Sequence, residues 1–385
     1  MTDHSNVHLQ LTVFALVAAS FTNIYLTQPI LPVLQNEFST NMVTVSFSVS
    51  AVIFGITIST LPFGFFADRL PIHPIIFSGN FLVALFGLVC ALTTNLWVLI
   101  GARFSQGLFI PALTTCLAAY LGKTLPAKRL NVVMGSYVSA TAIGGLGGRL
   151  LGGLIHPAIH WRYAFVSAAA IVLIATLTAL RQLPRKPVDA RKTRDAAGFW
   201  SLLHRWDLLR LFFCATGSFS IFSSIFNYLP FRMAEPPFNF STEMTTLLYL
   251  VYLVIIFISP VVGQISNRFG SGNTLLGGSI ILTAALSLIL MPYIAAIVLG
   301  ILGVCAGFSF IHTAAVGSLN RKLSNSHGRA NALYVLFYYM GGWLGITVTG
   351  FAYQQGGWGA VVFMCAFLLL IPVIAGIAEL KTVNQ

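Results

Sequence analysis

Twelve long stretches of this chain are rich in apolar residues and almost free of charged ones. A stretch of about 20 such residues can cross the hydrocarbon core of a bilayer as a helix, because lipid offers the backbone no other hydrogen-bond partner. The pattern therefore predicts an all-α integral membrane protein with twelve transmembrane helices. The predicted spans are residues 9–31, 42–66, 75–92, 96–121, 130–155, 163–180, 208–231, 244–265, 274–290, 294–319, 330–352 and 359–378.

Composition and charge agree with this interpretation and add an orientation. Apolar residues make up 57% of the chain and charged residues 8%, and the formal net charge is +12. Of the 21 lysines and arginines, 17 lie on one side of the predicted membrane, 2 on the other side and 2 inside spans. Because cytoplasmic segments carry the excess of cations, both termini and the central loop are predicted to be cytoplasmic. The positive charge therefore indicates topology and attraction to anionic lipids, and no nucleic-acid partner is expected.

The chain contains an internal repeat. A polar, basic segment over residues 182–206 separates six spans from six. Residues 144–161 align without gaps with residues 341–358, an offset of 197, and two shorter matches have offsets of 199 and 200. A nearly constant offset across three matches predicts two related six-helix bundles, residues 1–181 and 207–385, joined by a cytoplasmic linker.

Three motifs carry a resemblance to a known family. Residues 64–69 (GFFADR) are similar to a G-x-x-x-D-R loop signature, residues 103–107 (RFSQG) to an R-x-x-Q-G helix motif, and residues 144–153 (GGLGGRLLGG) to the antiporter motif G-P-x-x-G-G. The whole chain thus resembles the major facilitator superfamily, in particular its drug/proton antiporters and the related sugar-efflux permeases. Two features depart from the family pattern: residues 71–73 (PIH) replace a glycine and two cations, and Arg149 replaces the proline of the antiporter motif.

The resemblance implies the major facilitator fold, in which two pseudo-symmetric six-helix bundles expose a cavity alternately to the two sides of the membrane. It also implies a secondary transporter that exports a small organic solute in exchange for protons. No phosphate-binding loop of the G-x-x-x-x-G-K-[ST] type is present to drive transport with ATP. Import or uniport of an organic anion is the alternative, which the altered antiporter motif permits.

Two arginines, Arg103 and Arg149, lie inside predicted spans, in the outer half of the bilayer. A charge there is costly unless it faces water or a partner, and none of the nine acidic residues lies deep in a span. Glu37, at the outer end of the first span, is the nearest candidate partner. Because a guanidinium suits a carboxylate or phosphate, the pair predicts a cavity for an anionic or strongly hydrogen-bonding group. Alternatively, carbonyl groups and Gln28 satisfy Arg103, while Arg149 extends to the outer interface.

His312 is the other ionisable residue deep in a span. Histidine titrates near physiological pH, so this residue is the candidate carrier of the coupling proton where membrane carboxylates are absent. The alternative is a neutral histidine that bonds to a helix carbonyl.

Polar residues occur beside a proline at corresponding places in the first helix of each half. They are Tyr25 and Gln28 in the first span, and Asn227 and Tyr228 in the seventh. In the family the first helix of each half lines the cavity, and a proline allows it to bend. The resemblance therefore adds these four residues to the two arginines as substrate-binding candidates.

Charged and polar residues at the cytoplasmic ends of corresponding spans form a candidate latch. Asp68 can accept hydrogen bonds from helix N-terminal amides or pair with a cation such as Arg129. Such a contact would hold the cytoplasmic side shut and break when the protein opens inward. The alternative is an interfacial anchor that only fixes topology. The latch candidates are Asp68, Arg69, Arg129, Asn267 and Arg268.

Glycines gather in the fifth and eleventh spans. Each costs a helix roughly 1 kcal/mol relative to alanine, so a cluster indicates a close helix crossing. In the family these helices lie between the halves, which implies rocking there; static packing of small residues is the alternative. The residues concerned are Gly144, Gly145, Gly148, Gly152, Gly341 and Gly345.

Other classes of function receive little support. The sequence has no H-E-x-x-H or G-x-S-x-G motif and no pair of intramembrane carboxylates, so no enzyme is expected, and the short loops disfavour a sensor. The five cysteines fall within spans without a C-x-x-C pair, so no metal site or cofactor is expected. The expected partners are the lipid bilayer, a small-molecule substrate that is anionic or polyhydroxylated, and the proton. We expect a multi-pass monomer in the inner membrane of the cell.

Overall fold

The computed structural model describes residues 3–125, 127–182, 198–323 and 327–383, apart from some helix side chains, among them those of Asp68 and Arg129. These residues form helices joined by short loops, and no strand occurs among them. Ten of the described helices are long and apolar enough to cross a membrane, and a shorter apolar helix covers His8–Thr22. The last of the ten, Gly328–Lys381, has 54 residues, enough for two crossings. The described helices thus account for the twelve predicted spans.

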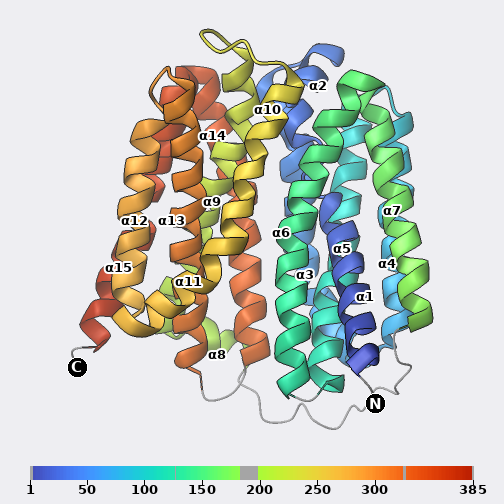
Figure 1. The fold of residues 1–385 in the computed structure, drawn as a ribbon, viewed down its shortest axis with the longest axis vertical. Coiled ribbons are helices and arrows are strands. Elements are labelled where there is room, and N and C mark those ends of the chain that lie inside the picture. The colour runs from blue at the N-terminus through green and yellow to red at the C-terminus, as the bar shows by residue number, and fades with distance from the viewer. Residues whose placement is uncertain (1–2, 126, 183–197, 324–326, 384–385) are drawn as a thin grey trace. The chain divides into compact units, whose positions relative to one another are not determined.

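Contacts divide the chain into two compact units. Unit 1 comprises Met1–Thr40 and Phe47–Arg194, and unit 2 comprises Asn41–Ser46 and Asp195–Gln385. The helices of the N-terminal half are α1 (Asp3–Thr22), η1 (Gln28–Ile30), α2 (Leu31–Glu37), α3 (Met42–Arg69), α4 (Ile72–Leu92), α5 (Leu96–Thr124), α6 (Ala127–Ala158) and α7 (Trp161–Gln182) (Figure 1). Those of the C-terminal half are α8 (Phe199–Leu203), α9 (Trp206–Ala234), α10 (Thr242–Leu248), η3 (Tyr249–Tyr252), α11 (Leu253–Phe269), α12 (Ser271–Leu288), α13 (Ile294–Arg321), α14 (His327–Leu368) and α15 (Leu370–Val383).

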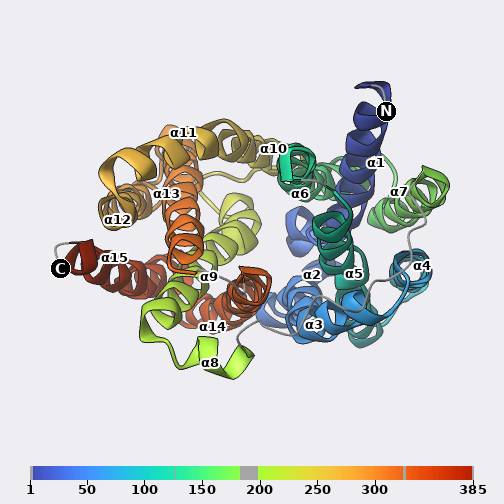
Figure 2. The same cartoon turned by 90° about the horizontal axis from the view of Figure 1, so that it is seen from below.

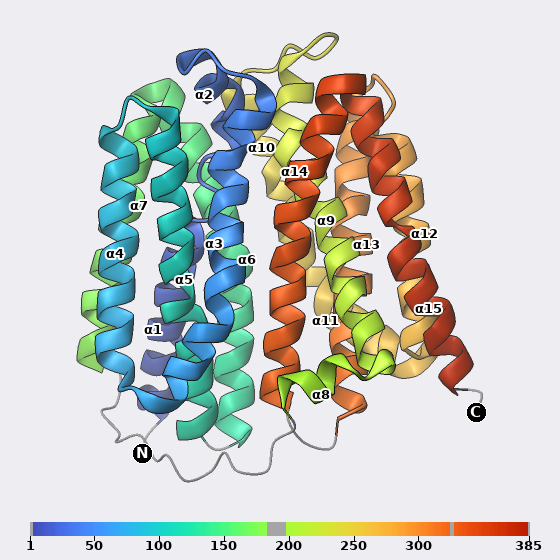
Figure 3. The same ribbon diagram turned by 180° about the vertical axis from the view of Figure 1, so that it is seen from behind.

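Helices that the sequence repeat relates to each other make the same contacts in the two units. In unit 1, α1 packs against α6, and α4 packs against α5 and α7. In unit 2, α9 packs against α14, and α12 packs against α13 and α15, as the view along the helices in Figure 2 shows. Each unit is therefore a six-span bundle with the same internal arrangement, which is the pseudo-symmetric fold predicted from the repeat. The short helix α8 lies across the ends of α9 and α14 (Figure 3).

The described helices differ from the predicted spans in three places. The first span stops as a regular helix at Thr22 and resumes at η1. The eighth span consists of α10, the 3-10 segment η3 and α11 in sequence. The eleventh and twelfth spans meet inside α14 at Gly357, where a φ of 65° favours glycine and turns the chain between two crossings. The first interruption lies among the buried polar side chains of Asn23, Thr27 and Gln28.

Apolar side chains occupy both the inside and the outside of each unit. In unit 1, α1, α4 and α5 contribute Leu16, Ile76 and Leu113 to one buried cluster. Large apolar side chains also cover the surface: Phe257 and Phe363 are 74% and 76% exposed. A surface of this kind suits lipid, so buried polar groups are the informative ones.

Candidate functional site

The break between α1 and η1 brings polar backbone into the interior of unit 1. Pro29 and Pro32 lack the amide that a continuous helix needs, and the side chain of Asn23 bonds back to the carbonyl of Ala19 at 3.0 Å. The chain over residues 23–27 is therefore not helical. The carbonyls of Asn23 and Ile24, which helix amides would otherwise use, need other donors.

Arg103 on α5 supplies these donors. Its Nη1 donates to the carbonyl of Asn23 at 2.5 Å and its Nη2 to the carbonyl of Ile24 at 2.6 Å. Its Nε donates to the carbonyl of Ser48 on α3 at 2.9 Å, and Nη1 also bonds Oε1 of Gln106 at 2.8 Å. The side chain is completely buried. Carbonyl oxygens thus satisfy Arg103 in the way that the second sequence interpretation describes, but Gln28 takes no part.

Gln28 instead contacts the other buried arginine, Arg149 on α6. Arg149 Nε donates to Gln28 Oε1 at 2.7 Å, Nη1 donates to the carbonyl of Gly145 at 2.8 Å, and the guanidinium carbon lies 4.0 Å from the centre of the Tyr25 ring. Only 1% of Arg149 is exposed, so the side chain does not extend to an interface. Three of the predicted substrate-binding residues therefore meet at one place, beside the break.

Several polar atoms around the break are buried without a hydrogen-bond partner. In unit 1 they are Asn23 Oδ1, Thr27 Oγ1, Gln28 Nε2, Ser48 Oγ and Ser50 Oγ. Each such atom costs about 1–3 kcal/mol when it stays unpaired, so a group of them is typical of a place that accepts water or a ligand. The arrangement offers hydrogen-bond donors and one positive charge to a small polar molecule.

The corresponding residues of unit 2 are engaged in helix packing. Asn227 Nδ2 donates to Ser46 Oγ at 3.1 Å, and Tyr228 Oη donates to the carbonyl of Ile346 at 2.8 Å. Both side chains are completely buried. In contrast to α1, α9 continues through Pro230 without a break. The structure thus brings together Tyr25, Gln28 and Arg149. Asn227 and Tyr228 instead connect α9 to Ser46 and to α14.

His312 on α13 lies in an aromatic environment within unit 2. Its Nδ1 is 3.0 Å from Oη of Tyr334 on α14. The rings of Phe308 and Tyr338 each lie with their centres 5.4 Å from the centre of the imidazole. The hydroxyl of Tyr334, which can donate or accept, is therefore within hydrogen-bond distance of the His312 imidazole. The role in proton transfer stays a prediction.

The latch candidates are only partly visible. The side chains of Asp68 and Arg129 lie outside the described residues. The guanidinium of Arg69 lies over the ring of Phe65 at 3.7 Å, and that of Arg268 over the ring of Phe269 at 5.3 Å. Asn267 Oδ1 accepts a hydrogen bond from Arg321 at 3.5 Å. The latch also stays a prediction.

The predicted glycines lie where helices of the same unit cross. A Cβ on Gly144, Gly148 or Gly152 would overlap backbone of the α1 segment and its continuation, and one on Gly341 or Gly345 would overlap backbone of α9. Gly145 differs, since its Cβ would meet the Arg149 guanidinium at 3.4 Å and the Tyr25 ring. Small size at these positions is therefore a requirement of packing inside each bundle, whatever motion the bundles make.

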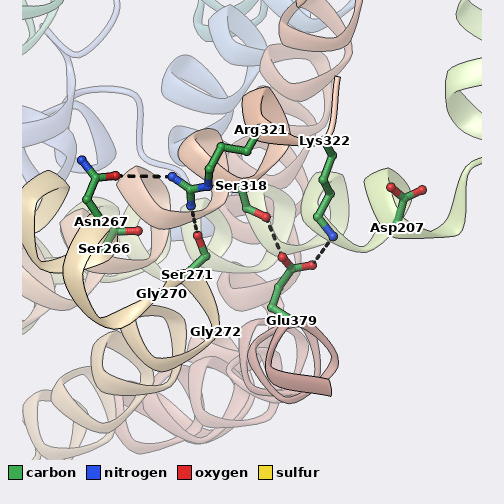
Figure 4. Close-up of a pocket in the computed structure, with 10 residues that line it drawn as sticks. All are labelled: Asp207, Ser266, Asn267, Gly270, Ser271, Gly272, Ser318, Arg321, Lys322 and Glu379. Atoms are coloured by element: carbon green, nitrogen blue, oxygen red, sulfur yellow. Dashed lines mark hydrogen bonds and ion pairs between the residues drawn. The ribbon is translucent and has the colours of Figure 1, made fainter. Parts of the chain in front are cut away.

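The sequence analysis missed two ionic clusters. At one end of unit 2, Glu379 on α15 accepts hydrogen bonds from Lys322 at 2.8 Å and from Ser318 at 2.6 Å, as Figure 4 shows. It also accepts a hydrogen bond from Arg210 at 2.5 Å. The available signal was that Glu379, directly after the last predicted span, is the single acidic residue of α15, at the end where cations gather.

The second cluster lies in unit 1 and contains Glu37. Arg162 Nη1 donates to Glu37 Oε1 at 2.7 Å, and Trp161 Nε1 donates to Oε2. Partial burial opposes ionisation of Glu37, but the hydrogen bonds from Trp161 and Arg162 outweigh it and hold the pKa of the carboxyl below its usual value. Glu37 is therefore the partner of Arg162, not of either buried arginine.

Comparisons with known proteins agree on one family. The sequence profile of the Major Facilitator Superfamily matches residues 13–326. The chain is 28% identical to the inner membrane transport protein YnfM of Escherichia coli, covering 96% of this chain and 90% of that protein. It is 27% identical to an uncharacterized MFS-type transporter, YybF, of Bacillus subtilis, covering 93% and 90%. Among solved structures, a bacterial homologue of the human lysosomal transporter Spinster, inward-facing and unoccupied, superposes with a TM-score of 0.79 at 14% identity and 99% coverage of both chains.

Proposed function

Because the chain belongs to the Major Facilitator Superfamily and is a multi-pass membrane transporter rather than an enzyme, we propose that it exports a small organic solute in exchange for protons by alternating access. Arg149, Tyr25 and Gln28 bind a polar or anionic group of the solute, and His312 carries the proton. Arg103 acts indirectly, because it holds the carbonyls of the break in α1 and so positions Tyr25 and Gln28.

The single observation that carries this proposal is the state of Gln28. Its Oε1 accepts a hydrogen bond from Arg149, and its Nε2, which can only donate, is buried without a hydrogen-bond partner. A buried donor without an acceptor costs free energy that a substrate oxygen can recover. Since that donor lies next to a buried guanidinium, the group that fits best is a carboxylate, a phosphate or a cluster of hydroxyls.

The ring of Tyr25 defines one wall of the proposed site. It covers the guanidinium of Arg149 at 4.0 Å, a cation–π contact that keeps the charge in place while water is excluded. In a water-poor site the attraction between Arg149 and an anionic group is stronger than in bulk water. A negatively charged solute should therefore bind this site with a more favourable free energy than a neutral one.

Transport in everted membrane vesicles tests the proposal. After respiration acidifies the vesicle lumen, addition of an exported solute should raise the luminal pH as protons leave in exchange. Organic acids, sugars and phosphate esters are the solutes to compare. Arg149→Gln should abolish the response, whereas Arg181→Gln, which removes an exposed arginine at the end of α7, should leave it intact. Full activity of Arg149→Gln would contradict the assigned site.

The proton role of His312 needs a separate measurement. His312→Gln should keep exchange of labelled solute for unlabelled solute but lose the change in luminal pH, because the glutamine can bond to Tyr334 and cannot titrate. Tyr334→Phe is the matched variant that removes the hydroxyl and keeps the imidazole. If His312→Gln retains full proton exchange, another group carries the proton.

One observation favours a second candidate function, the import or uniport of an organic anion. Arg149 stands where the antiporter motif has proline, and it donates hydrogen bonds to the side chain of Gln28 and to the carbonyl of Gly145, both of which are neutral. Flux of an organic acid without any change in luminal pH would establish this alternative in place of proton exchange.

A further inference from the structure

A second polar site lies in unit 2, where α11 ends and α12 begins. A cavity of about 520 Å³ opens there, with walls from α9, α11, α12, α13 and α15 (Figure 4). Its volume is within the range of small-molecule sites, roughly 300–1,000 Å³. The cavity is separate from the residues assigned above to the transported solute, which lie in unit 1.

The N-terminus of α12 faces this cavity. The helix has 18 residues and begins at Ser271, directly after Gly270, whose φ of 85° sets the entry of the chain. No side chain caps its first amides. Ser271 and Gly272 of its first turn line the cavity. Free amides and the positive end of the helix dipole both favour an anion at this place.

A buried hydroxyl also belongs to the cavity wall. Ser266 on α11 lines the cavity, is only 4% exposed, and its Oγ is buried without a hydrogen-bond partner. Nothing in the packing of the described residues uses this hydroxyl, although leaving it unpaired costs free energy. An occupant with hydrogen-bonding oxygens explains why a serine stands there.

Arg321 supplies the positive charge. Its guanidinium donates to Ser271 Oγ and, at 3.5 Å, to Asn267 Oδ1, both of which are neutral acceptors (Figure 4). The two carboxylates that line the cavity are occupied by other cations. Glu379 accepts from Arg210 and Lys322, and Asp207 accepts from Arg205 at 2.7 Å.

We propose that this cavity binds a phosphate group carried by an organic ester. The phosphate oxygens accept from the α12 amides, from Ser266 and from the Arg321 fork, which matches a phosphate in two parallel hydrogen bonds. The volume exceeds what one phosphate ion needs, so the ester substituent is accommodated as well. Two sources present this chemistry at the end of a membrane bundle: the headgroup of a phospholipid and a soluble phosphate ester.

Binding to purified protein tests the proposal. The probes are glycerol 1-phosphate, with glycerol as the uncharged control, and phosphatidylglycerol retained on delipidated protein, measured by thermal shift and by native mass spectrometry. Arg321→Gln should raise the Kd about tenfold or more, because it removes a charged hydrogen-bond donor. Ser266→Ala should weaken binding less and should leave the fold intact. Arg329→Gln, which removes an arginine at the start of α14 outside the cavity wall, is the matched control.

The outcomes separate the two sources. Binding of glycerol 1-phosphate that Arg321→Gln weakens supports a soluble ester. Retention of phosphatidylglycerol that Arg321→Gln weakens, without binding of glycerol 1-phosphate, supports a lipid headgroup. The proposal is overturned if the wild-type protein binds neither probe, or if Arg321→Gln and Ser266→Ala bind both as tightly as Arg329→Gln.

Discussion

Arg103 and Arg149 are both buried, but their hydrogen-bond partners differ. Arg103 directs its donors at three backbone carbonyls and Gln106. Arg149 has neutral contacts to Gln28 and Gly145 and lies next to an amide donor that lacks an acceptor. A guanidinium saturated by backbone holds structure, whereas one with donors gathered beside it can hold a ligand.

Arg103→Ala should therefore reduce stability. It leaves the carbonyls of Asn23 and Ile24 buried without donors and removes the hydrogen bond to the Ser48 carbonyl of α3. Each unpaired group costs about 1–3 kcal/mol, so the loss should reach roughly 2 kcal/mol or more. Thermal unfolding of the purified protein in detergent measures it. Ser105→Ala is the control, since Ser105 on the same helix bonds only to its own turn. An unchanged Tm for Arg103→Ala would show that the break does not depend on this side chain.

The ionisation of Glu37, the last residue of α2, makes the stability of the folded protein depend on pH. Its pKa is lower in the folded protein than in the unfolded chain, mainly through hydrogen bonds from Trp161 and Arg162 that outweigh the effect of burial. Its contribution is present above the ordinary carboxyl pKa of about 4.5 and disappears as the pH falls through the lowered value. As the pH is lowered from 6 to about 3, the Tm of the wild-type protein should thus fall more steeply than the Tm of Glu37→Gln. Parallel pH profiles would contradict this account.

Sequence reasoning identified both arginines, because a charge inside an apolar stretch is visible without a structure. It could not assign their partners. Three of the acceptors of Arg103 are backbone carbonyls, two in the break after α1 and one on α3, and backbone carbonyls carry no residue-specific signal. Their availability depends on where α1 stops, and the polar residues and prolines of residues 23–32 indicate bending without fixing the last helical residue.

At the scale of elements, the crossing of α6 over α1 explains the spacing of the glycines. Gly144, Gly148 and Gly152 follow one another at intervals of four, so they lie on one face of α6, and that face contacts α1 and its continuation. The matching glycines on α14 contact α9. The sequence predicted a close crossing, but it did not specify a partner helix within the same bundle.

Neighbouring glycines of α6 should therefore respond differently to alanine. In Gly148→Ala the new Cβ would overlap the carbonyl oxygen of Thr22, so the two helices must separate, at a cost of about 1–3 kcal/mol. In Gly147→Ala the nearest atom is Thr22 Oγ1 at 3.6 Å, an ordinary contact, and better helix propensity should make the change neutral or stabilising by up to about 1 kcal/mol. Thermal unfolding of the two variants compares them directly. Equal losses would indicate that the crossing is looser than the structure shows.

At the scale of the whole molecule, the pattern of apolar stretches and the internal repeat were enough to predict the fold. Charge-free stretches define the spans, and the repeat offset near 199 residues defines two bundles with equivalent helix contacts. The cavity of unit 2 was beyond such reasoning. Its walls come from five helices, and its decisive members, Ser266 and Arg321, are an inconspicuous serine and one cation among many at that end.

The same charge pattern predicts the orientation of the whole molecule in the membrane, and this prediction can be measured. The positive-inside rule predicts that Thr94, in the loop after α4, faces the outside and that Ser201, in α8, faces the cytoplasm. The five native cysteines are buried, so single added cysteines can be labelled against a silent background. A membrane-impermeant maleimide should label Thr94→Cys in intact cells and Ser201→Cys only in everted vesicles. The opposite pattern would invert the topology, and with it the direction of transport that the vesicle experiment assigns.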